Sequence, residues 1–464
     1  MTKVTIDDKD MPQLRQALAA ESMAAAFDEF FRKEYPARGL KVEACSICRV
    51  YHKPGKECNI TYRLLGHDGE QRPFDQWFYG HLSPNLGNRI QHLKNQPQEW
   101  PGCGFWKPTT IWPEMNMLLQ AFPYDSKLPY LGQLLELDFV KPQIEKNLSG
   151  FGLSREWKCR EVACHKIKYM PGKRCILRYE ILLTNAANSL RQIAFYSKTY
   201  NSAKSRYVYE VLQKICASPA CAGGLLNIPG PIAHIEDANT LWQQAWKGEK
   251  FPEMMEEIGW DNFPNTDFPC KIASMLATLH CLALPDLRLN TGPSPYMVLE
   301  NARGDANDIM QFFPEKQATL EEITRTLETW ARRNDANTPQ ATIHGSFKLA
   351  QLLCRNQELG LVDFDSLACG DPHYDVAEFL ASLLYLPVSD NVPTQAISRG
   401  VESFLASYQK QVPWTCDRRR IAWYVVAFLL GKIHSSLKRF EAPVTENIDS
   451  AFALVETWLE WLEK

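Results

Sequence analysis

The sequence predicts an α+β protein of two lobes, with a β-rich part first and a mainly helical part after it. Two segments, one running to about residue 95 and one spanning 155–201, each contain a strand, a Pro-Gly turn, a strand, a polar loop and a strand. After residue 246 the apolar residues recur mostly with helical spacing. A strand at 240–245 leads into this remainder through Trp246-Lys247-Gly248. Strands first, helices after and a hinge between them indicate the two-lobed plan.

The two β-rich segments form an internal repeat at one fixed offset. Residues 54–58 (Pro-Gly-Lys-Glu-Cys) match residues 171–175 (Pro-Gly-Lys-Arg-Cys). Gapless agreement of this kind indicates duplication of a β-hairpin unit rather than a solenoid. The third strand of the second copy carries Lys198, where the first copy has His81. The agreement continues at the same offset with Tyr62 and Tyr179, Leu65 and Leu182, and Phe78-Tyr79 and Phe195-Tyr196.

The other elements of the first half follow from apolar spacing and turn residues. Residues 11–35 are predicted to be helical, because their apolar residues form a rough face at Leu14, Leu18, Met23, Ala26 and Phe30. The further expected elements are proline-rich loops over 97–130, a helix beginning between Pro129 and Leu137, strands at 164–169, 175–183 and 192–200, and a helix at 202–217.

The second half is predicted to be helical apart from one loop and one strand. Ile272, Met275, Leu276 and Leu279 form a stripe with the spacing of one helix face. A loop at His344 and a strand leading to Asp363 interrupt the helices, and an amphipathic helix is expected around 448–462. The chain therefore divides into an N-terminal extension (1–145), a β-rich lobe (150–245) and a helical lobe (246–464).

Composition and charge exclude several classes of protein. With 464 residues, 45% of them apolar, the chain can bury the cores of two or three units. A net charge of −3 provides no basic field, so nucleic acid is not an expected partner. The apolar run 421–430 is about half of the ~20 residues that a membrane span needs, so a buried helix is expected and no membrane partner.

Cysteine usage indicates a cytoplasmic protein. The fourteen cysteines are scattered, and the N-terminal residues, which include Lys3 and the acidic stretch 7–10, contain no apolar leader. Reduced, mostly buried thiols are therefore expected. Cys45 and Cys48 form a CxxC pair, but no second pair accompanies it and it lies in a β-rich run, so a structural role is favoured over zinc or redox chemistry.

Two segments of the helical lobe contain closely spaced polar and charged residues. His344–Gln351 reads His-Gly-Ser-Phe-Lys-Leu-Ala-Gln, and Leu361–Asp375 contains Leu-Val-Asp-Phe-Asp followed by Gly-Asp-Pro-His-Tyr-Asp. These segments resemble the aminoglycoside phosphotransferase and choline kinase family, whose catalytic loop usually reads His-Gly-Asp with an Asn five positions after the Asp. The motifs of the resemblance cover roughly 155–385. It implies a protein-kinase-like fold, ATP and Mg²⁺ as cofactors and a small molecule with a hydroxyl group as acceptor.

The resemblance also implies the residues that bind the nucleotide. Lys198, at the end of a strand, stands where the family has its phosphate-binding lysine, and Glu210 is the only acidic residue of the following helix that can be its partner. Lys173 and Arg174 follow the Pro-Gly turn and can supply positive charge in place of a glycine-rich loop. Gln243, in the strand before the hinge, is a further candidate for nucleotide binding.

For the metal, the resemblance implies Asp363 as principal ligand and Gln351 as second ligand, because carboxylate and amide oxygens suit Mg²⁺. If the strand continues, its period of two places Asp365 on the same face as Asp363. His344 is expected to brace the loop, Asp371 to cap a helix that begins at Pro372, and Asp375 to point back at the loop.

The catalytic position departs from the family. Ser346 stands where the family has the Asp that aligns the acceptor hydroxyl, and Gln351 stands where it has the Asn. Lys348 follows two residues later, a spacing that resembles that of the catalytic-loop lysine in protein kinases and implies a contact with the γ-phosphate, and Asp365 is a candidate substitute base.

Three functions stay open at the level of sequence. They are a kinase acting on a small polar alcohol, a pseudokinase that regulates or scaffolds, and an unrelated enzyme that transfers nucleotidyl groups. Residues 1–145 form either an extra lobe or a surface for a protein partner.

Overall fold

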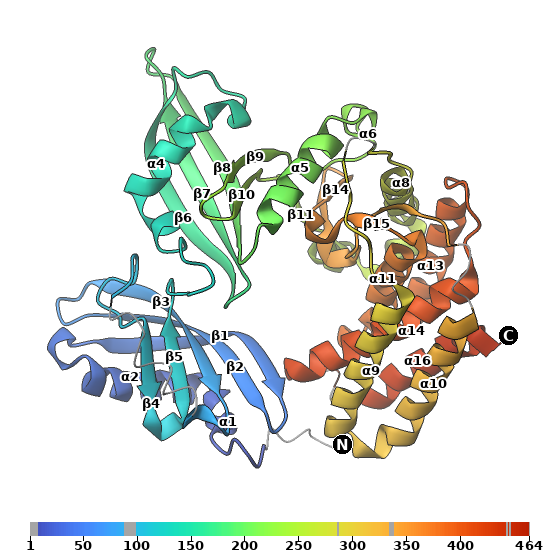
Figure 1. The fold of residues 1–464 in the computed structure, drawn as a ribbon, viewed down its shortest axis with the longest axis horizontal. Helices are drawn as coiled ribbons and strands as arrows, with labels where there is room; N and C mark the ends of the chain where they lie inside the picture. Colours follow the sequence, from blue (N-terminus) through green and yellow to red (C-terminus); the bar gives the residue numbers. More distant parts are fainter. Residues whose placement is uncertain are drawn as a thin grey trace.

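Two antiparallel β-sheets and a mainly helical part build the molecule (Figure 1). The computed structural model describes residues 8–87, 99–284, 287–333, 338–441, 444 and 447–463. Strands dominate up to residue 250 and helices dominate afterwards, which confirms the predicted α+β plan. In strand order, the first sheet contains β1 (Lys41–Lys53), β2 (Glu57–His67), β3 (Pro73–Leu82), β5 (Met117–Ala121) and β4 (Thr109–Trp112), and the second contains β6 (Lys158–Met170), β7 (Arg174–Thr184), β8 (Leu190–Tyr200), β10 (Thr240–Gln244) and β9 (Pro231–Ile235).

Both Pro-Gly segments form antiparallel hairpins, as the repeat predicted. Lys53 lies opposite Glu57 at the end of the first hairpin, and Met170 lies opposite Arg174 at the end of the second. Gly55 and Gly172 adopt positive φ angles of 66° and 67°, a conformation that glycine adopts without steric cost. The third strand of each unit then pairs with the second. The last part of the predicted first unit, 88–95, lies outside the described residues.

Helices cover one face of each sheet. Helix α2 (Ala20–Glu34), preceded by the short α1 (Leu14–Ala17), packs Phe27 and Phe31 against the first sheet. The predicted helix at 11–35 is therefore present in two pieces. The helix expected to begin between Pro129 and Leu137 begins only at Leu137, because turns and a short 3-10 segment (Gln133–Leu135) precede it. It is α4 (Leu137–Lys146), which covers the second sheet.

The helical part has its own core, centred on α11 (Pro372–Leu384) and α14 (Arg418–Lys438). The run 421–430 lies within α14 and all but one of its residues are buried, as predicted. No helix in the described ranges combines the length and apolar character that crossing a bilayer requires. The other helices are α7 (Phe251–Ile258), α8 (Phe268–His280), α9 (Pro295–Phe312), α10 (Gln317–Arg333), α12 (Leu386–Ser389), α13 (Thr394–Gln409) and α16 (Ile448–Glu463).

Helix α5 (Lys204–Cys216) connects the second sheet to the helical part. It follows β8 directly, is itself followed by the short α6 (Pro219–Ala222), and its apolar face belongs to the core of the helical part. Two small sheets complete the junction, one of β11 (Glu249–Lys250), β13 (Leu352–Arg355) and β14 (Glu358–Leu361), the other of β12 (Ala341–Ile343) and β15 (Ala368–Gly370). The end of β8 is thereby held close to the loops that follow β12 and β14.

The cysteines are unpaired, as predicted, but the expected burial is wrong for most of them, because only Cys58, Cys103, Cys175 and Cys354 are buried. All fourteen are free thiols. Cys45 and Cys48 lie within β1, and burial raises the pKa of Cys45 to about 12. A thiol with so high a pKa is not activated as a nucleophile, which agrees with a structural role.

Candidate phosphoryl-transfer site

A carboxylate on α11 holds the loop that follows β12. Asp375 is fully buried, and its Oδ2 and Oδ1 accept the backbone N–H groups of His344 at 2.5 Å and of Gly345 at 2.8 Å. His280 Nε2 lies 3.1 Å from the same Oδ2 and fixes the carboxylate from α8. Asp371 caps α11 by accepting the N–H of His373. The predictions for Asp371 and Asp375 are therefore confirmed.

The conformation of this loop depends on Gly345 and on the buried side chain of His344. Gly345 has a φ of 71°, and a Cβ on it would lie 2.2 Å from the carbonyl oxygen of Ser366. His344 is fully buried, with Nε2 3.1 Å from the carbonyl oxygen of Val362. Burial lowers the pKa of His344, so a neutral ring joins the two loops, as expected for a bracing residue.

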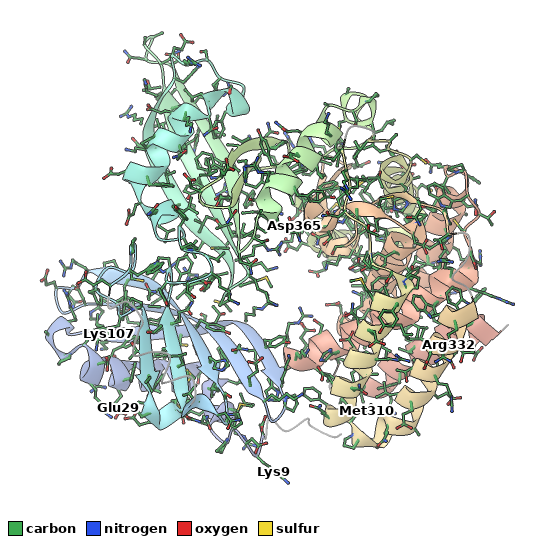
Figure 2. The ribbon with its side chains drawn as sticks, viewed as in Figure 1. Lys9, Glu29, Lys107, Met310, Arg332 and Asp365 are labelled. Atoms are coloured by element: carbon green, nitrogen blue, oxygen red, sulfur yellow. The ribbon has the colours of Figure 1, made fainter. Side chains whose placement is uncertain are left out.

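Asp363 and Asp365 lie together at the end of β14, where a turn replaces the expected strand. Asp363 adopts a left-handed conformation with a φ of 70°, and Phe364–Ser366 form a 3-10 turn. The prediction that a continuing strand places Asp363 and Asp365 on one face is therefore wrong. The two carboxylates nevertheless share the same cationic partners. Figure 2 shows Asp365 where the second sheet meets the helical part.

Three residues of the second sheet contact this carboxylate pair. Lys198 Nζ lies 2.8 Å from Asp363 Oδ1 and 3.5 Å from Asp365 Oδ1. Arg174 Nη1 contacts Asp365 and lies 3.5 Å from Asp363 Oδ1, and the Tyr200 hydroxyl donates to Asp365 Oδ1 at 2.7 Å. From the loop side, Gln351 Nε2 lies 3.4 Å from Asp363 Oδ2. The structure thus gathers five of the predicted residues (Lys198, Arg174, Asp363, Asp365, Gln351) at one point.

The charges of this cluster stabilise one another. Burial raises the pKa of Asp363, but the charges of Lys198 and Arg174 outweigh it and hold that pKa well below its usual range. Burial lowers the pKa of Lys198, which is 8% exposed, but Asp365 and Asp363 raise it above its usual value. Lys198 and Asp363 therefore both stay charged across the neutral range.

Three predicted nucleotide-binding residues lie apart from this cluster. Glu210 is exposed on α5, because Val208, Val211 and Leu212 turn the opposite face inward; the expected Lys198–Glu210 pair is wrong, and the aspartates take its place. Lys173 is exposed at the hairpin turn and lines a cavity of about 370 Å³ against the first sheet. Gln243 is buried and donates to the carbonyl oxygen of Pro229 at 3.3 Å.

Ser346 and Lys348 face a carboxylate that sequence reasoning missed. Glu378 on α11 has its Oε1 3.9 Å from Lys348 Nζ, and the Ser346 hydroxyl lies close enough to its carboxylate to lower the pKa of Glu378. The sequence contained a pattern that could have identified Glu378, because this residue follows Asp375 by three positions in a predicted helix and so lies on the same helix face.

Glu378 also lines a cavity with a volume of about 680 Å³. Lys348 from the loop and Lys432 and Arg439 from α14 supply positive charge to its wall. Phe428 and Tyr385 supply apolar surface.

A second group of cations comes from three separate parts of the chain. Arg49 of β1, Lys168 of β6 and Arg439 at the end of α14 line a neighbouring cavity of about 430 Å³. Burial and the charges of Arg174, Arg49 and Lys348 lower the pKa of Lys168, whereas Asp363 raises it. Glu441, which pairs with Arg439 at 2.9 Å, is the only acidic residue among the described residues that line this cavity. The electrostatic field of this cavity therefore favours an anion.

The chain matches one family model. Residues 196–436, which run from within β8 to near the end of α14 and include the whole carboxylate cluster except Arg174, match the model described as the phosphotransferase enzyme family. Among curated proteins, none matches this sequence significantly.

Solved structures of low identity are similar to parts of this chain. A choline kinase of Cryptosporidium parvum is 12% identical, with 71% of this chain and 96% of that chain covered and a TM-score of 0.47. An ethanolamine kinase of Plasmodium vivax is 14% identical, with 64% and 82% covered and a TM-score of 0.41. An aminoglycoside phosphotransferase of Streptomyces rimosus, solved with ADP and streptomycin, is 16% identical, with 64% and 99% covered and a TM-score of 0.37.

Proposed function

The chain belongs to the phosphotransferase enzyme family, and we propose that it transfers the γ-phosphoryl group of ATP to a hydroxyl of a small polar molecule. The observation that supports this most directly is the cluster of Lys198, Arg174, Asp363 and Asp365. Phosphoryl transfer needs cations for the phosphate oxygens and oxygen ligands for a metal ion, and this cluster supplies both.

The residues at the end of β14 fit Mg²⁺. Asp363 and Asp365 offer carboxylate oxygens, and Gln351 offers an amide oxygen, the hard donors that Mg²⁺ prefers. No group of three or more His, Cys, Asp or Glu side chains in the described part of the chain could hold a metal on its own. A site that shares the ion with the phosphates of a nucleotide suits this modest donor set. Bound there, Mg²⁺ would neutralise charge on the phosphate oxygens.

The cations of the site then have distinct roles. Lys198, which the aspartates hold in its charged form, contacts the α- and β-phosphates from the second sheet. Arg174 exchanges its carboxylate contacts for phosphate oxygens, for which a guanidinium is well suited. Lys348, whose side chain is 38% exposed and lines the 680 Å³ cavity, contacts the γ-phosphate.

The acceptor binds in the 680 Å³ cavity between the loop and α14. Its volume lies within the range of small-molecule sites, and its wall combines aromatic surface with charged groups of both signs. A polar molecule of moderate size with at least one hydroxyl group fits this lining.

The N-terminal sheet contributes to the same site. Arg49 reaches the 430 Å³ cavity from β1, and we propose that it attracts the nucleotide phosphates together with Lys168. The extension thus acts as an additional wall of the cleft. A protein partner for its outer face stays a prediction, as do the domain boundaries and a cytoplasmic location.

A regulatory nucleotide-binding module is the second candidate, and one observation favours it. The catalytic loop has Ser346 in the position of the family's carboxylate, and serine is a poor proton acceptor near neutral pH. Such a protein would bind Mg·ATP without turning it over.

Two measurements on the purified full chain separate the candidates. Thermal unfolding with and without Mg·ATP tests nucleotide binding, and a slow-turnover ATPase assay tests chemistry. Stabilisation with hydrolysis supports the kinase, and stabilisation without hydrolysis supports the regulatory module. Absence of stabilisation at millimolar Mg·ATP would exclude both.

A further inference from the structure

Glu378 brings a carboxylate to the place where the catalytic loop lacks one. Its Oε1 lies 3.9 Å from Lys348 Nζ, and the Ser346 hydroxyl lies close enough to the same carboxylate to lower its pKa. Lys348 and Ser346 are two residues apart in the loop. The carboxylate of Glu378 therefore lies beside the position from which the family's Asp would act.

Helix α11 fixes both the loop and this carboxylate. Asp375 holds the N–H groups of His344 and Gly345, and Glu378 lies three residues further along the same helix face. One rigid element thus sets the backbone of the loop and the position of Glu378 relative to Ser346. Such coupling gives a side chain the positional precision that a catalytic group needs.

Burial brings the pKa of Glu378 into the neutral range. Burial raises its pKa to about 7, although Lys348 from the loop, Lys432 from α14 and the Ser346 hydroxyl lower it. Asp375, on its own helix, raises it as well. Tyr374 also interacts electrostatically with Glu378. Arg439 and Glu441 affect the pKa of Lys432, which in turn affects that of Glu378.

Glu378 also reaches the acceptor cavity. Its side chain is 15% exposed and lines the 680 Å³ cavity, while its Oε2 is buried without a hydrogen-bond partner in the described part of the molecule. The part of the Glu378 side chain that is exposed to the cavity allows its carboxylate to accept a hydrogen bond from a ligand there.

We propose that Glu378 replaces the missing loop carboxylate and accepts the proton of the acceptor hydroxyl bound in this cavity. The hydroxyl oxygen forms a bond to the γ-phosphorus while the bond from that phosphorus to the β–γ bridging oxygen breaks. The hydroxyl proton moves to the Glu378 carboxylate, and ADP leaves with the electron pair of the broken bond. Ser346 orients the carboxylate, and the proton later passes to water.

This inference rests on the proposed kinase function, and ATP hydrolysis by water in the full chain tests it without a known acceptor. We expect Glu378→Gln to reduce hydrolysis on the order of 10²-fold, the lower range for loss of general-base catalysis. The wild-type rate should rise with pH to a plateau above about 7, because only the deprotonated Glu378 can accept a proton. Glu378→Gln should lose that dependence, whereas ionisation of ATP affects both proteins equally.

A second variant distinguishes catalysis from a structural role. The double variant with Ser346→Asp and Glu378→Gln has a carboxylate in the loop again. It should hydrolyse ATP at least 10-fold faster than Glu378→Gln alone, and its rate should reach the plateau at a lower pH than that of the wild type. Glu402→Gln, which removes an exposed carboxylate from α13, is the matched control and should leave the rate unchanged.

The outcomes are distinguishable from failure of the proposed function. A wild type that Mg·ATP does not stabilise contradicts the proposed function itself. If Mg·ATP stabilises all variants and Glu378→Gln hydrolyses ATP at the wild-type rate with the same pH profile, the role of Glu378 is overturned. Stabilisation of the wild type with no hydrolysis at any pH overturns it as well, and favours the regulatory module.

Discussion

Lys198 and Asp363, 165 residues apart in the chain, form an ion pair of 2.8 Å across the junction between the second sheet and the helical part. A pair this deeply placed is sensitive to the loss of either partner, because the remaining charge would be buried without compensation. It also joins the residues that we assign to the phosphates and to the metal ion. The first prediction therefore concerns this pair.

Mg·ATP should raise the melting temperature of the wild type, because a ligand that binds only the folded state stabilises it. At a concentration of about 100 times Kd the gain is about 2.7 kcal/mol. Lys198→Met and Asp363→Asn should each abolish the rise while the proteins remain folded by circular dichroism. Lys204→Met, which removes an exposed lysine at the start of α5, should keep the full rise. An unchanged rise in Asp363→Asn would contradict the assigned metal site.

Asp375→Ala should destabilise the fold on the order of 3–5 kcal/mol. It leaves the N–H groups of His344 and Gly345 and the ring of His280 without their buried acceptor, and each buried unsatisfied group costs about 1–3 kcal/mol. Urea denaturation measures the loss. Asp417→Ala is the control, because it removes only an exposed N-cap of α14 and should cost about 1 kcal/mol. Equal losses in the two variants would show that Asp375 does not carry the loop.

Glu378 should make the wild type less stable as the pH rises from about 4.5 to 7. Because burial raises its folded-state pKa to about 7, the native state binds more protons than the unfolded state across this window, and stability falls with pH. A shift of this size corresponds to roughly 3 kcal/mol. Glu378→Gln cannot titrate, so the stability difference between variant and wild type should grow by about that amount between these pH values. Urea denaturation at pH 4.5 and 8 measures it, and parallel pH profiles for the two proteins would contradict the assignment.

Arg49→Gln should weaken Mg·ATP binding about 5- to 10-fold, because a charge-assisted contact contributes on the order of 1 kcal/mol or more. The loss should shrink as salt concentration rises, since salt screens partly exposed charges. Isothermal titration calorimetry at two salt concentrations measures both effects. Arg63→Gln, on the neighbouring strand and paired with Asp75 outside the cleft, should bind as the wild type does. Equal affinity for Arg49→Gln and the wild type would remove the N-terminal sheet from the nucleotide site.

Much of the local structure follows from the sequence. The Pro-Gly turns of both hairpins were predictable because Gly55 and Gly172 lie between alternating apolar strands, and these features act over a few residues. The buried helix at 421–430 and the cap of α11 at Asp371 have the same local origin. The start of α4 was misplaced, because prolines and a 3-10 turn compete with helix over 129–136 and short-range spacing does not decide between them.

The candidate site could be predicted only in part from the sequence. The motifs identified Lys198, Asp363 and Gln351, which the fold then brings together. They could not identify the partner of Lys198, because Glu210 has the right type and the right interval but the packing of Val208 and Val211 turns it outward. The geometry of Asp363 and Asp365 also escaped prediction, since a positive φ at Asp363 converts an expected strand into a turn.

By itself, then, the sequence determined the order of β-rich and helical parts, the two hairpins, the loop at His344 and the residue types that a phosphotransferase needs, because all of these are encoded in short intervals of the chain. Only the tertiary structure decided which charges meet. It placed Arg174 and Lys198 on the aspartates, Glu378 beside Ser346, and Arg49 of the N-terminal sheet in the cleft. These contacts join segments far apart in sequence, and they depend on which faces of the helices and sheets are buried against one another, which no local pattern specifies.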